Sequence, residues 1–180
     1  MSLRSDETLE AFVNRIIRNE EIMDILGLPC IYDDDNEELI DEKRKVLIDK
    51  FITKTSQIPA SLDKNNFETI KIGKKKYSNY GKKRITISFA QSIKINHDLF
   101  GRPQVDIYVY YDNTEMDGVY KLLDLISDEF SGQNLKVSLE DNSYFIKNIR
   151  NEGLSSQTSI INNYERIGIR FSYFSTVYKN

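Results

Sequence analysis

The sequence is poor in the residue types on which catalysis, metal binding and disulfide formation depend. Its 180 residues include one cysteine (Cys30), one histidine (His97) and no tryptophan. A single cysteine excludes an intramolecular disulfide and a cysteine-based metal cage within one subunit. A single histidine excludes the H-E-x-x-H zinc motif and leaves Cys30 and His97 as the one His–Cys pair to consider. We therefore predict no cofactor, no metal ion and no enzymatic activity.

Long apolar runs and glycine-rich motifs are also missing. No stretch approaches the roughly 18 apolar residues of a membrane span, and residues 1–12 lack the apolar core of a signal peptide. We therefore expect the chain to stay in the cytoplasm unless a larger particle carries it out. The eight glycines are dispersed and form none of the phosphate-binding or nucleophile loops.

Hydrophobic residues make up 39% of the chain and charged residues 29%, a balance that predicts a folded globular protein. The length allows one full domain with an appendage. We predict an N-terminal helical extension over 1–58 and an α+β domain over 59–180.

Opposite charges gather in different parts of the chain. Residues 1–50 hold fourteen acidic and seven basic side chains, which gives a net charge of −7. Residues 64–84 hold eight basic side chains and one acidic, which gives +7. Such a distribution can orient subunits in an assembly or steer a charged partner.

Apolar spacing of three and four residues predicts helices over 6–26 and 37–52, and Gly27 with Pro29 ends the first. A third helix is predicted between a capping-box-like start at Thr114 and Asp117 and an end at Gly132.

Alternating apolar and polar residues predict strands over 67–72, 85–90, 105–110, 135–139 and 144–149, and a long closing strand that includes Ile167 to Tyr173. The segments 73–83, 97–102 and 152–158 are expected as loops or turns. Polar alternate positions in the second and third strands predict an antiparallel hairpin with one solvent-facing side. The fold class is therefore α+β, with a mostly antiparallel sheet of about six strands and helices packed on one face.

Two charged segments are candidates for binding. The acidic run Asp33, Asp34, Asp35, Glu37 and Glu38 lacks the glycine and closing glutamate of a calcium-binding EF-hand, so a solvated helix start is favoured. The basic segment could grip nucleic-acid phosphates while its tyrosines stack on bases. A solvated loop between strands, or a loop that docks on an acidic neighbour such as residues 33–42 of another subunit, is favoured over nucleic-acid binding. This segment contains Lys74, Lys75, Lys76, Tyr77, Tyr80, Lys82, Lys83 and Arg84.

From about Ile85 to Tyr178 the sequence resembles the tail terminator or tail-completion proteins of long-tailed bacteriophages. The resemblance lies in the order of elements rather than in a signature motif. It comprises the strand pair RITISFAQSIKI and QVDIYVYYDN, the helix EMDGVYKLLDLISDEF, the strand NSYFIKNIRN and the final strand YERIGIRFSYFSTVY.

The resemblance implies a mixed sheet with helices packed on it, and a six-membered ring that caps the tail tube, stops its polymerisation and joins it to the neck or connector. The expected partners are copies of the chain, the tail tube protein, the neck or connector protein and, through the leading helices, a tail sheath. A membrane and a specific nucleic acid are not expected, although DNA would pass through the ring. The expected location is the virion, after assembly in the host cytoplasm.

Contacts between subunits or with partners are expected at the two charged segments, at the 97–102 turn with His97 and Arg102, and at the polar 152–158 loop. Two other functions stay open. A head-tail adaptor is the nearest alternative within the structural class, and a single-strand nucleic-acid-binding module that uses 74–84 is the alternative from another class.

Overall fold

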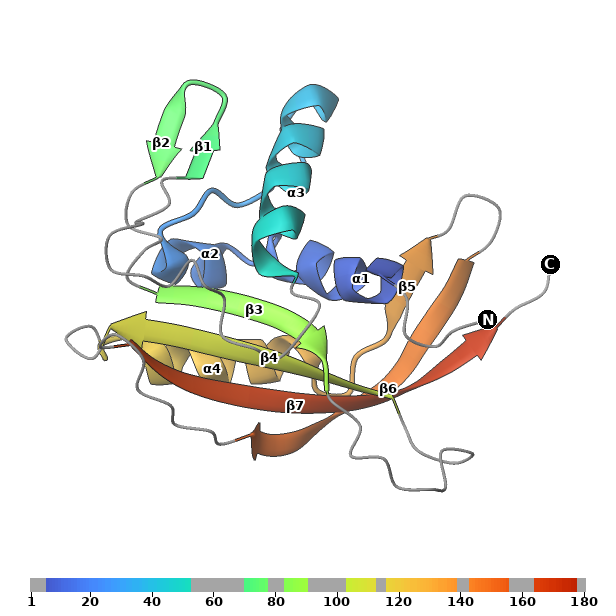
Figure 1. The fold of residues 1–180 in the computed structure, drawn as a ribbon. Helices are drawn as coiled ribbons and strands as arrows, with labels where there is room; N and C mark the ends of the chain where they lie inside the picture. Colours follow the sequence, from blue (N-terminus) through green and yellow to red (C-terminus); the bar gives the residue numbers. More distant parts are fainter. Residues whose placement is uncertain are drawn as a thin grey trace.

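In a computed structural model, residues 6–52, 70–77, 83–90, 103–112, 116–138, 143–155 and 164–177 are placed well enough to be described. They form four helices and seven strands (Figure 1). The helices are α1 (Asp6–Ile16), α2 (Glu20–Leu26), α3 (Glu37–Phe51) and α4 (Val119–Phe130). The strands are β1 (Ile70–Ile72), β2 (Lys75–Tyr77), β3 (Lys83–Phe89), β4 (Gln104–Asp112), β5 (Leu135–Ser138), β6 (Ser143–Ser155) and β7 (Tyr164–Val177).

The strands form a five-stranded sheet and a separate two-stranded hairpin. The order in the larger sheet is β3-β4-β7-β6-β5, and each neighbouring pair is antiparallel. The predicted α+β fold with an antiparallel sheet is therefore confirmed. The edges of this sheet are β3 and β5, and the outer side of β3 carries a parallel bridge between Ile87 and Ile52 at the end of α3.

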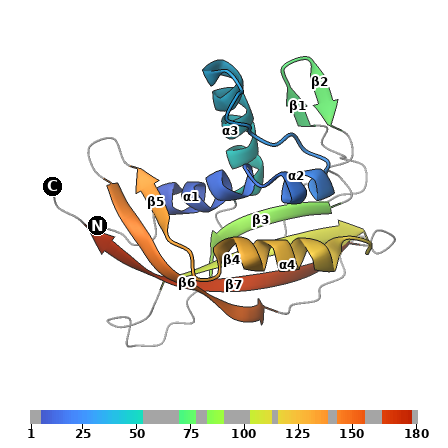
Figure 2. The ribbon, with the colours of Figure 1, turned by 180° about the vertical axis from the view of Figure 1, so that it is seen from behind.

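Helices α1, α2 and α4 cover one face of the sheet (Figures 1 and 2). Packing of helices on one face was predicted, but α1 and α2 were expected in an N-terminal extension. Phe12 of α1 is fully buried, and its ring lies 4.8 Å from that of Phe130 in α4 and 6.2 Å from that of Tyr173 in β7. Helix α1 therefore shares the main hydrophobic core with the sheet. The predicted domain boundary at residue 58 lies outside the described residues.

The predicted single helix over 6–26 is wrong, because two helices meet at residues 17–19. The side chain of Asn19 accepts a hydrogen bond from the backbone N–H of Ile22 and caps α2. Gly27, with φ of 68°, ends α2 in the left-handed conformation that favours glycine. The break lets the two short helices follow the curved sheet while both keep their apolar sides in the core.

Other boundaries also differ from the prediction. Helix α4 begins at Val119, and its N-cap is Gly118 without a side-chain hydrogen bond, so the predicted capping-box start is wrong. Strand β6 extends to Ser155 and takes in residues 152–155 of the predicted 152–158 loop. It carries register shifts after Lys147 and Asn151, and Asn148 has a positive φ of 52° at the first of them.

Over β3 and β4 the face of the sheet opposite the helices is buried, which corrects the solvent-facing side predicted for this hairpin. Thr86, Ser88 and Asp106 are at most 6% exposed although they lie on that face. Their neighbours Arg84, Tyr108 and Tyr110 are equally buried. Alternation in the sequence correctly assigned side chains to the two faces of the hairpin, but the polar face is buried rather than exposed to solvent.

Candidate functional site

The acidic segment is held in place by hydrogen bonds to its own neighbourhood. The Lys43 ammonium donates to Asp35 at 2.5 Å and to the backbone oxygen of Cys30 at 2.8 Å. Asp35 also accepts a hydrogen bond from the backbone N–H of Tyr32 at 3.0 Å. The hydrogen bond from Lys43, and after it the one from Tyr32, holds the pKa of the Asp35 carboxyl below its usual value. Asp33 pairs with Arg18 at 3.1 Å. Asp35 is thus structural, and the segment orders the start of α3.

The start of α3 presents acidic side chains to solvent. Asn36 caps the helix by accepting from the N–H of Leu39, and Glu37 and Glu38 follow in the first turn. Both glutamates are exposed, and so is Asp34 in the preceding turn. Carboxylates here favour the helix because its N-terminal end carries partial positive charge. The predicted solvated helix start agrees with this geometry.

The basic segment is divided between two places in the fold. Lys74, Lys75, Lys76 and Tyr77 lie at the turn and second strand of the β1–β2 hairpin rather than in a loop, which corrects the prediction. Lys83 and Arg84 instead begin β3, where Arg84 is only 6% exposed. The remaining predicted contact residues, Tyr80, Lys82, His97 and Arg102, lie outside the described residues.

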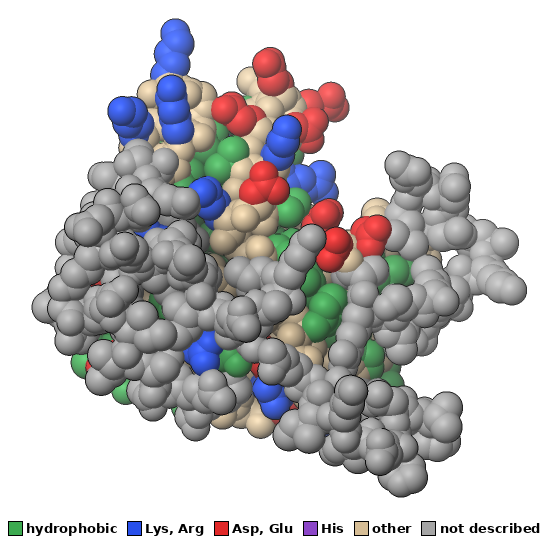
Figure 3. Space-filling view, in the orientation of Figure 1, with side chains coloured by type: hydrophobic (Ala, Val, Ile, Leu, Met, Phe, Trp, Pro, Cys, Tyr) green, Lys and Arg blue, Asp and Glu red, His purple; other side chains and the backbone are tan. Residues whose placement is uncertain are grey.

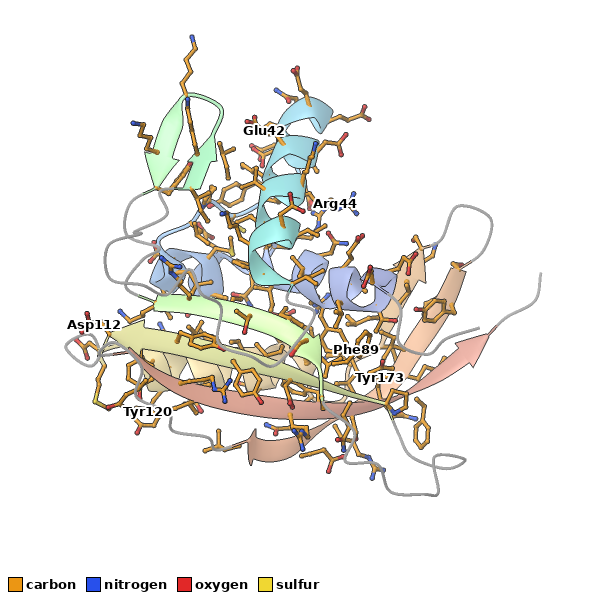
Figure 4. The ribbon with its side chains drawn as sticks, viewed as in Figure 1. Glu42, Arg44, Phe89, Asp112, Tyr120 and Tyr173 are labelled. Atoms are coloured by element: carbon orange, nitrogen blue, oxygen red, sulfur yellow. The ribbon has the colours of Figure 1, made fainter. Side chains whose placement is uncertain are left out.

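The hairpin stands beside the start of α3, at the end of the molecule that projects from the sheet (Figure 1). The backbone N–H of Gly73, at the hairpin turn, donates to Glu42 of α3 at 2.7 Å. Figure 4 shows Glu42 on the side of α3 that faces the hairpin, whereas Arg44 lies on the other side. The hairpin part of the basic segment and the acidic start of α3, which were expected to meet between different subunits, are therefore neighbours within one chain.

We call residues 37–42 and 71–76 together the charged tip. In the space-filling view its lysines project on one side and its carboxylates gather next to them (Figure 3). Lys71, Lys74, Lys75 and Lys76 are all exposed, as are Glu37, Glu38 and Asp41. Among the described residues none of these seven side chains forms an ion pair. The two charged sides thus lie next to each other without neutralising each other.

The hairpin also brings two lysines together. In the β1–β2 register Lys71 lies directly opposite Lys76, and Lys75 lies with its ammonium 5.2 Å from the centre of the Tyr77 ring. Like charges directly opposite each other destabilise a strand pair. The buried Ile70 and Ile72 hold the hairpin against the rest of the chain despite this repulsion. The hairpin thus concentrates positive charge although the Lys71–Lys76 repulsion destabilises its strand pair.

A cavity of about 440 Å³ lies below the tip, between α2 and the segment that leads to α3. Three carboxylates of α2 contribute to it, and Lys43, already neutralised by Asp35, lies among them. The Tyr32 hydroxyl donates to Glu20 at 2.9 Å, and burial followed by the charge of Glu20 raises the pKa of the Cys30 thiol. The cavity therefore favours a cationic group over an anion and a neutral thiol over a nucleophilic thiolate. Its lining residues are Glu20, Glu21, Asp24, Leu28, Pro29, Cys30, Tyr32 and Lys43.

The sheet face opposite the helices carries a second polar cluster, which the sequence analysis missed. Strand register aligns Arg84, Tyr110 and Arg166 in one row and Ser88, Asp106 and Arg170 in another. Arg170 donates to both Asp106 oxygens, at 2.7 and 2.9 Å, and this hydrogen bonding raises the pKa of the Arg170 guanidinium. The Arg166 guanidinium lies 4.4 Å from the centre of the Tyr108 ring.

The residues of this cluster were visible in the sequence as the polar positions of three alternating strands. What the sequence lacked was the register that brings β4 between β3 and β7. Arg170 and Asp106 bind each other across β7 and β4, and Arg166 of β7 lies over the Tyr108 ring of β4. Its arrangement suits structural cohesion of the sheet.

Within the described ranges, no three His, Cys, Asp or Glu side chains are placed to hold a metal ion. None of the helices there has the length and hydropathy that crossing a membrane requires. Comparison with protein-family models and with curated proteins finds no match for the chain.

Proposed function

We propose that the chain is a structural subunit of a bacteriophage tail, of the tail terminator or tail-completion kind, and has no catalytic role. In this proposal copies of the chain form a six-membered ring in the virion that ends the tail tube and joins it to the neck or connector. The support comes from the segments that carry the resemblance. They form strands β3, β4, β6 and β7 and helix α4. The four strands and β5 make one antiparallel sheet, and α4 packs on one face of it.

The sheet edges suggest how neighbouring copies would meet. Among the described residues β5 pairs with β6 alone, whereas β3 is bridged on its outer side by Ile52. A strand edge with unpaired backbone groups is a template for pairing with another chain. Edge β5 and the surface around it are therefore the best candidates for the heterologous contact that a closed ring requires.

Negative-stain electron microscopy of the purified chain tests this proposal. Class averages with six-fold symmetry are expected. Rings of another symmetry would contradict a tail terminator and favour a head-tail adaptor, the nearest alternative. Particles without any ring would contradict both.

The four exposed lysines of the hairpin favour a second candidate, a single-strand nucleic-acid-binding module. Titration of a labelled oligonucleotide at two salt concentrations distinguishes it. A binding module would bind tightly and lose affinity steeply with salt. The structural proposal predicts weak binding without sequence preference, because the carboxylates of α3 stand beside the lysines and repel phosphates.

A further inference from the structure

We infer that the charged tip is a self-association surface that pairs with the charged tip of a second copy about a two-fold axis. In this arrangement the hairpin of each copy lies against the start of α3 in the other. The contact is additional to the ring contact of the proposed function, because a two-fold contact by itself joins two copies and cannot close a six-membered ring.

The charges of the tip are placed for a reciprocal contact. The lysines of the hairpin and the carboxylates of α3 project from the same end of the molecule, side by side (Figures 1 and 3). Two patches on opposite sides of a subunit suit a head-to-tail contact. Two complementary patches side by side suit a reciprocal contact, because a half-turn places each positive patch on a negative one.

The exposed charges of the tip form no ion pairs among the described residues. The β1–β2 register sets Lys71 against Lys76, and none of the exposed lysines or carboxylates of the tip forms an ion pair among the described residues. Carboxylates from a partner would relieve the Lys71–Lys76 repulsion. The hydrogen bond from Gly73 to Glu42 holds the two patches in fixed relation, so the surface is formed before the partner arrives.

The mixed charge of the tip limits the kind of partner that it can bind. A nucleic acid would meet the lysines together with Glu38, Asp41 and Glu42, and these carboxylates would repel its phosphates. A purely basic protein would be repelled by the hairpin in the same way. A partner that carries both charges in mirrored order satisfies both patches, and a second copy of the chain is such a partner.

Charge exchange between the patches tests the inference. The hairpin variant is K74E/K76E, the helix variant is E38K/D41K, and the exchange variant combines all four substitutions. The hairpin variant should fold, because Glu at position 76 faces Lys71 across the strand pair. A matched control, D124K/D128K, reverses two exposed charges on α4, which belongs neither to the charged tip nor to edge β5. Circular dichroism establishes that each variant has the helix content of the wild type.

The particle mass by light scattering is the measured quantity. The hairpin and helix variants should each have half the mass of the wild type, whatever number of copies a ring contains. The exchange variant and an equimolar mixture of the two single-patch variants should regain the full mass, because reversed charges still match. The control should keep the wild-type mass. Salt at about 0.5 M should also halve the wild-type mass, because exposed charges are screened there.

Several results would overturn the inference. A hairpin variant with the wild-type mass would show that the tip does not pair. Loss of oligonucleotide binding in that variant, with its mass unchanged, would assign the lysines to a nucleic acid instead. An exchange variant that stays at half mass would exclude charge matching. Six-fold rings that persist in every variant at the wild-type mass would remove this inference and leave the proposed ring intact.

Discussion

At the scale of single residues, Tyr111 shows how the sheet binds a polar group within its core. Its side chain is 1% exposed, and its hydroxyl donates to Glu165 of the neighbouring strand β7 at 2.7 Å. Burial, and then the hydrogen bond to Glu165, raises the pKa of Tyr111 from 10 to about 12. A neutral hydroxyl is needed for that hydrogen bond, so the interaction should depend on pH.

Substitution of Tyr111 by Phe should lower the free energy of unfolding by about 1 to 2 kcal/mol at pH 7, because the hydrogen bond to a carboxylate is lost. The folded-state pKa is raised, so this stabilisation is complete below pH 10 and disappears as the pH rises from about 10 to 12. Absorbance at 295 nm follows tyrosine ionisation, and the ionisation that is present in the wild type and absent from the variant should lie at about pH 12. A missing transition near pH 10 would contradict the structure.

The Arg170–Asp106 pair gives a second prediction at this scale. Substitution of Arg170 by Met should lower the free energy of unfolding by about 2 to 3 kcal/mol, because the buried Asp106 carboxylate loses its cationic partner and keeps only the longer hydrogen bond from the Tyr108 hydroxyl, at 3.2 Å, among the described residues. The estimate lies below that for a fully buried pair because the Arg170 side chain is 36% exposed. Urea denaturation measures the change.

The double variant D106N/R170M is the control for that experiment. It should be more stable than R170M, since a neutral amide costs less to bury than an unpaired carboxylate. A double variant less stable than R170M would mean that the carboxylate is satisfied by other groups.

At the scale of elements, the relation of α1 to the sheet is the point at which the structure adds most. Substitution of Phe12 by Ala should lower the free energy of unfolding by about 3 to 5 kcal/mol, because Phe12 is fully buried between α4 and β7. Substitution of Tyr120 by Ala is the matched control. Tyr120 is 61% exposed, so its loss should change stability by less than about 0.5 kcal/mol.

Thermal or urea unfolding of both variants gives the comparison. If loss of the Phe12 ring cost no more than loss of the Tyr120 ring, α1 would be an independent appendage. The sequence analysis expected such an appendage because residues 6–26 show only an amphipathic helix. Amphipathicity predicts that one side is buried, but it does not tell which partner buries it.

The elements that the sequence predicted best are those with a long regular pattern. The apolar stripe of α4 and the alternation of β3, β4 and β7 were placed within a few residues. The break between α1 and α2 was missed because Asn19 interrupts the pattern without glycine or proline. Its effect depends on the cap it makes with Ile22 and on a bond to Glu129 of α4, which is a tertiary contact.

At the scale of the whole molecule, two arrangements could not be predicted because they depend on packing between distant segments. One is the register that aligns Arg84, Asp106 and Arg170 on a single sheet face. The other is the charged tip, where Glu42 meets Gly73 although 31 residues separate them. The acidic residues at the start of α3 and the lysines of the hairpin, which are far apart in the sequence, lie side by side at one end of the molecule.

This placement changes how the molecule would assemble. From the sequence, contacts between copies were expected at the acidic and basic segments, at the 97–102 turn and at the 152–158 loop. In the structure the hairpin part of the basic segment lies beside the acidic start of α3, so we assign ring closure to the sheet edge and reciprocal pairing to the tip. The two contacts would act independently, since one uses backbone groups and the other uses exposed charges.

The central claim is that the chain is an assembling structural subunit, and its mass in solution tests this most directly. Native mass spectrometry or mass photometry of the wild type, over a dilution series and at about 0.5 M salt to screen the tips, should find particles of six 21.0 kDa chains that dissociate on dilution. A mass of 21.0 kDa at every concentration and salt level would contradict the account.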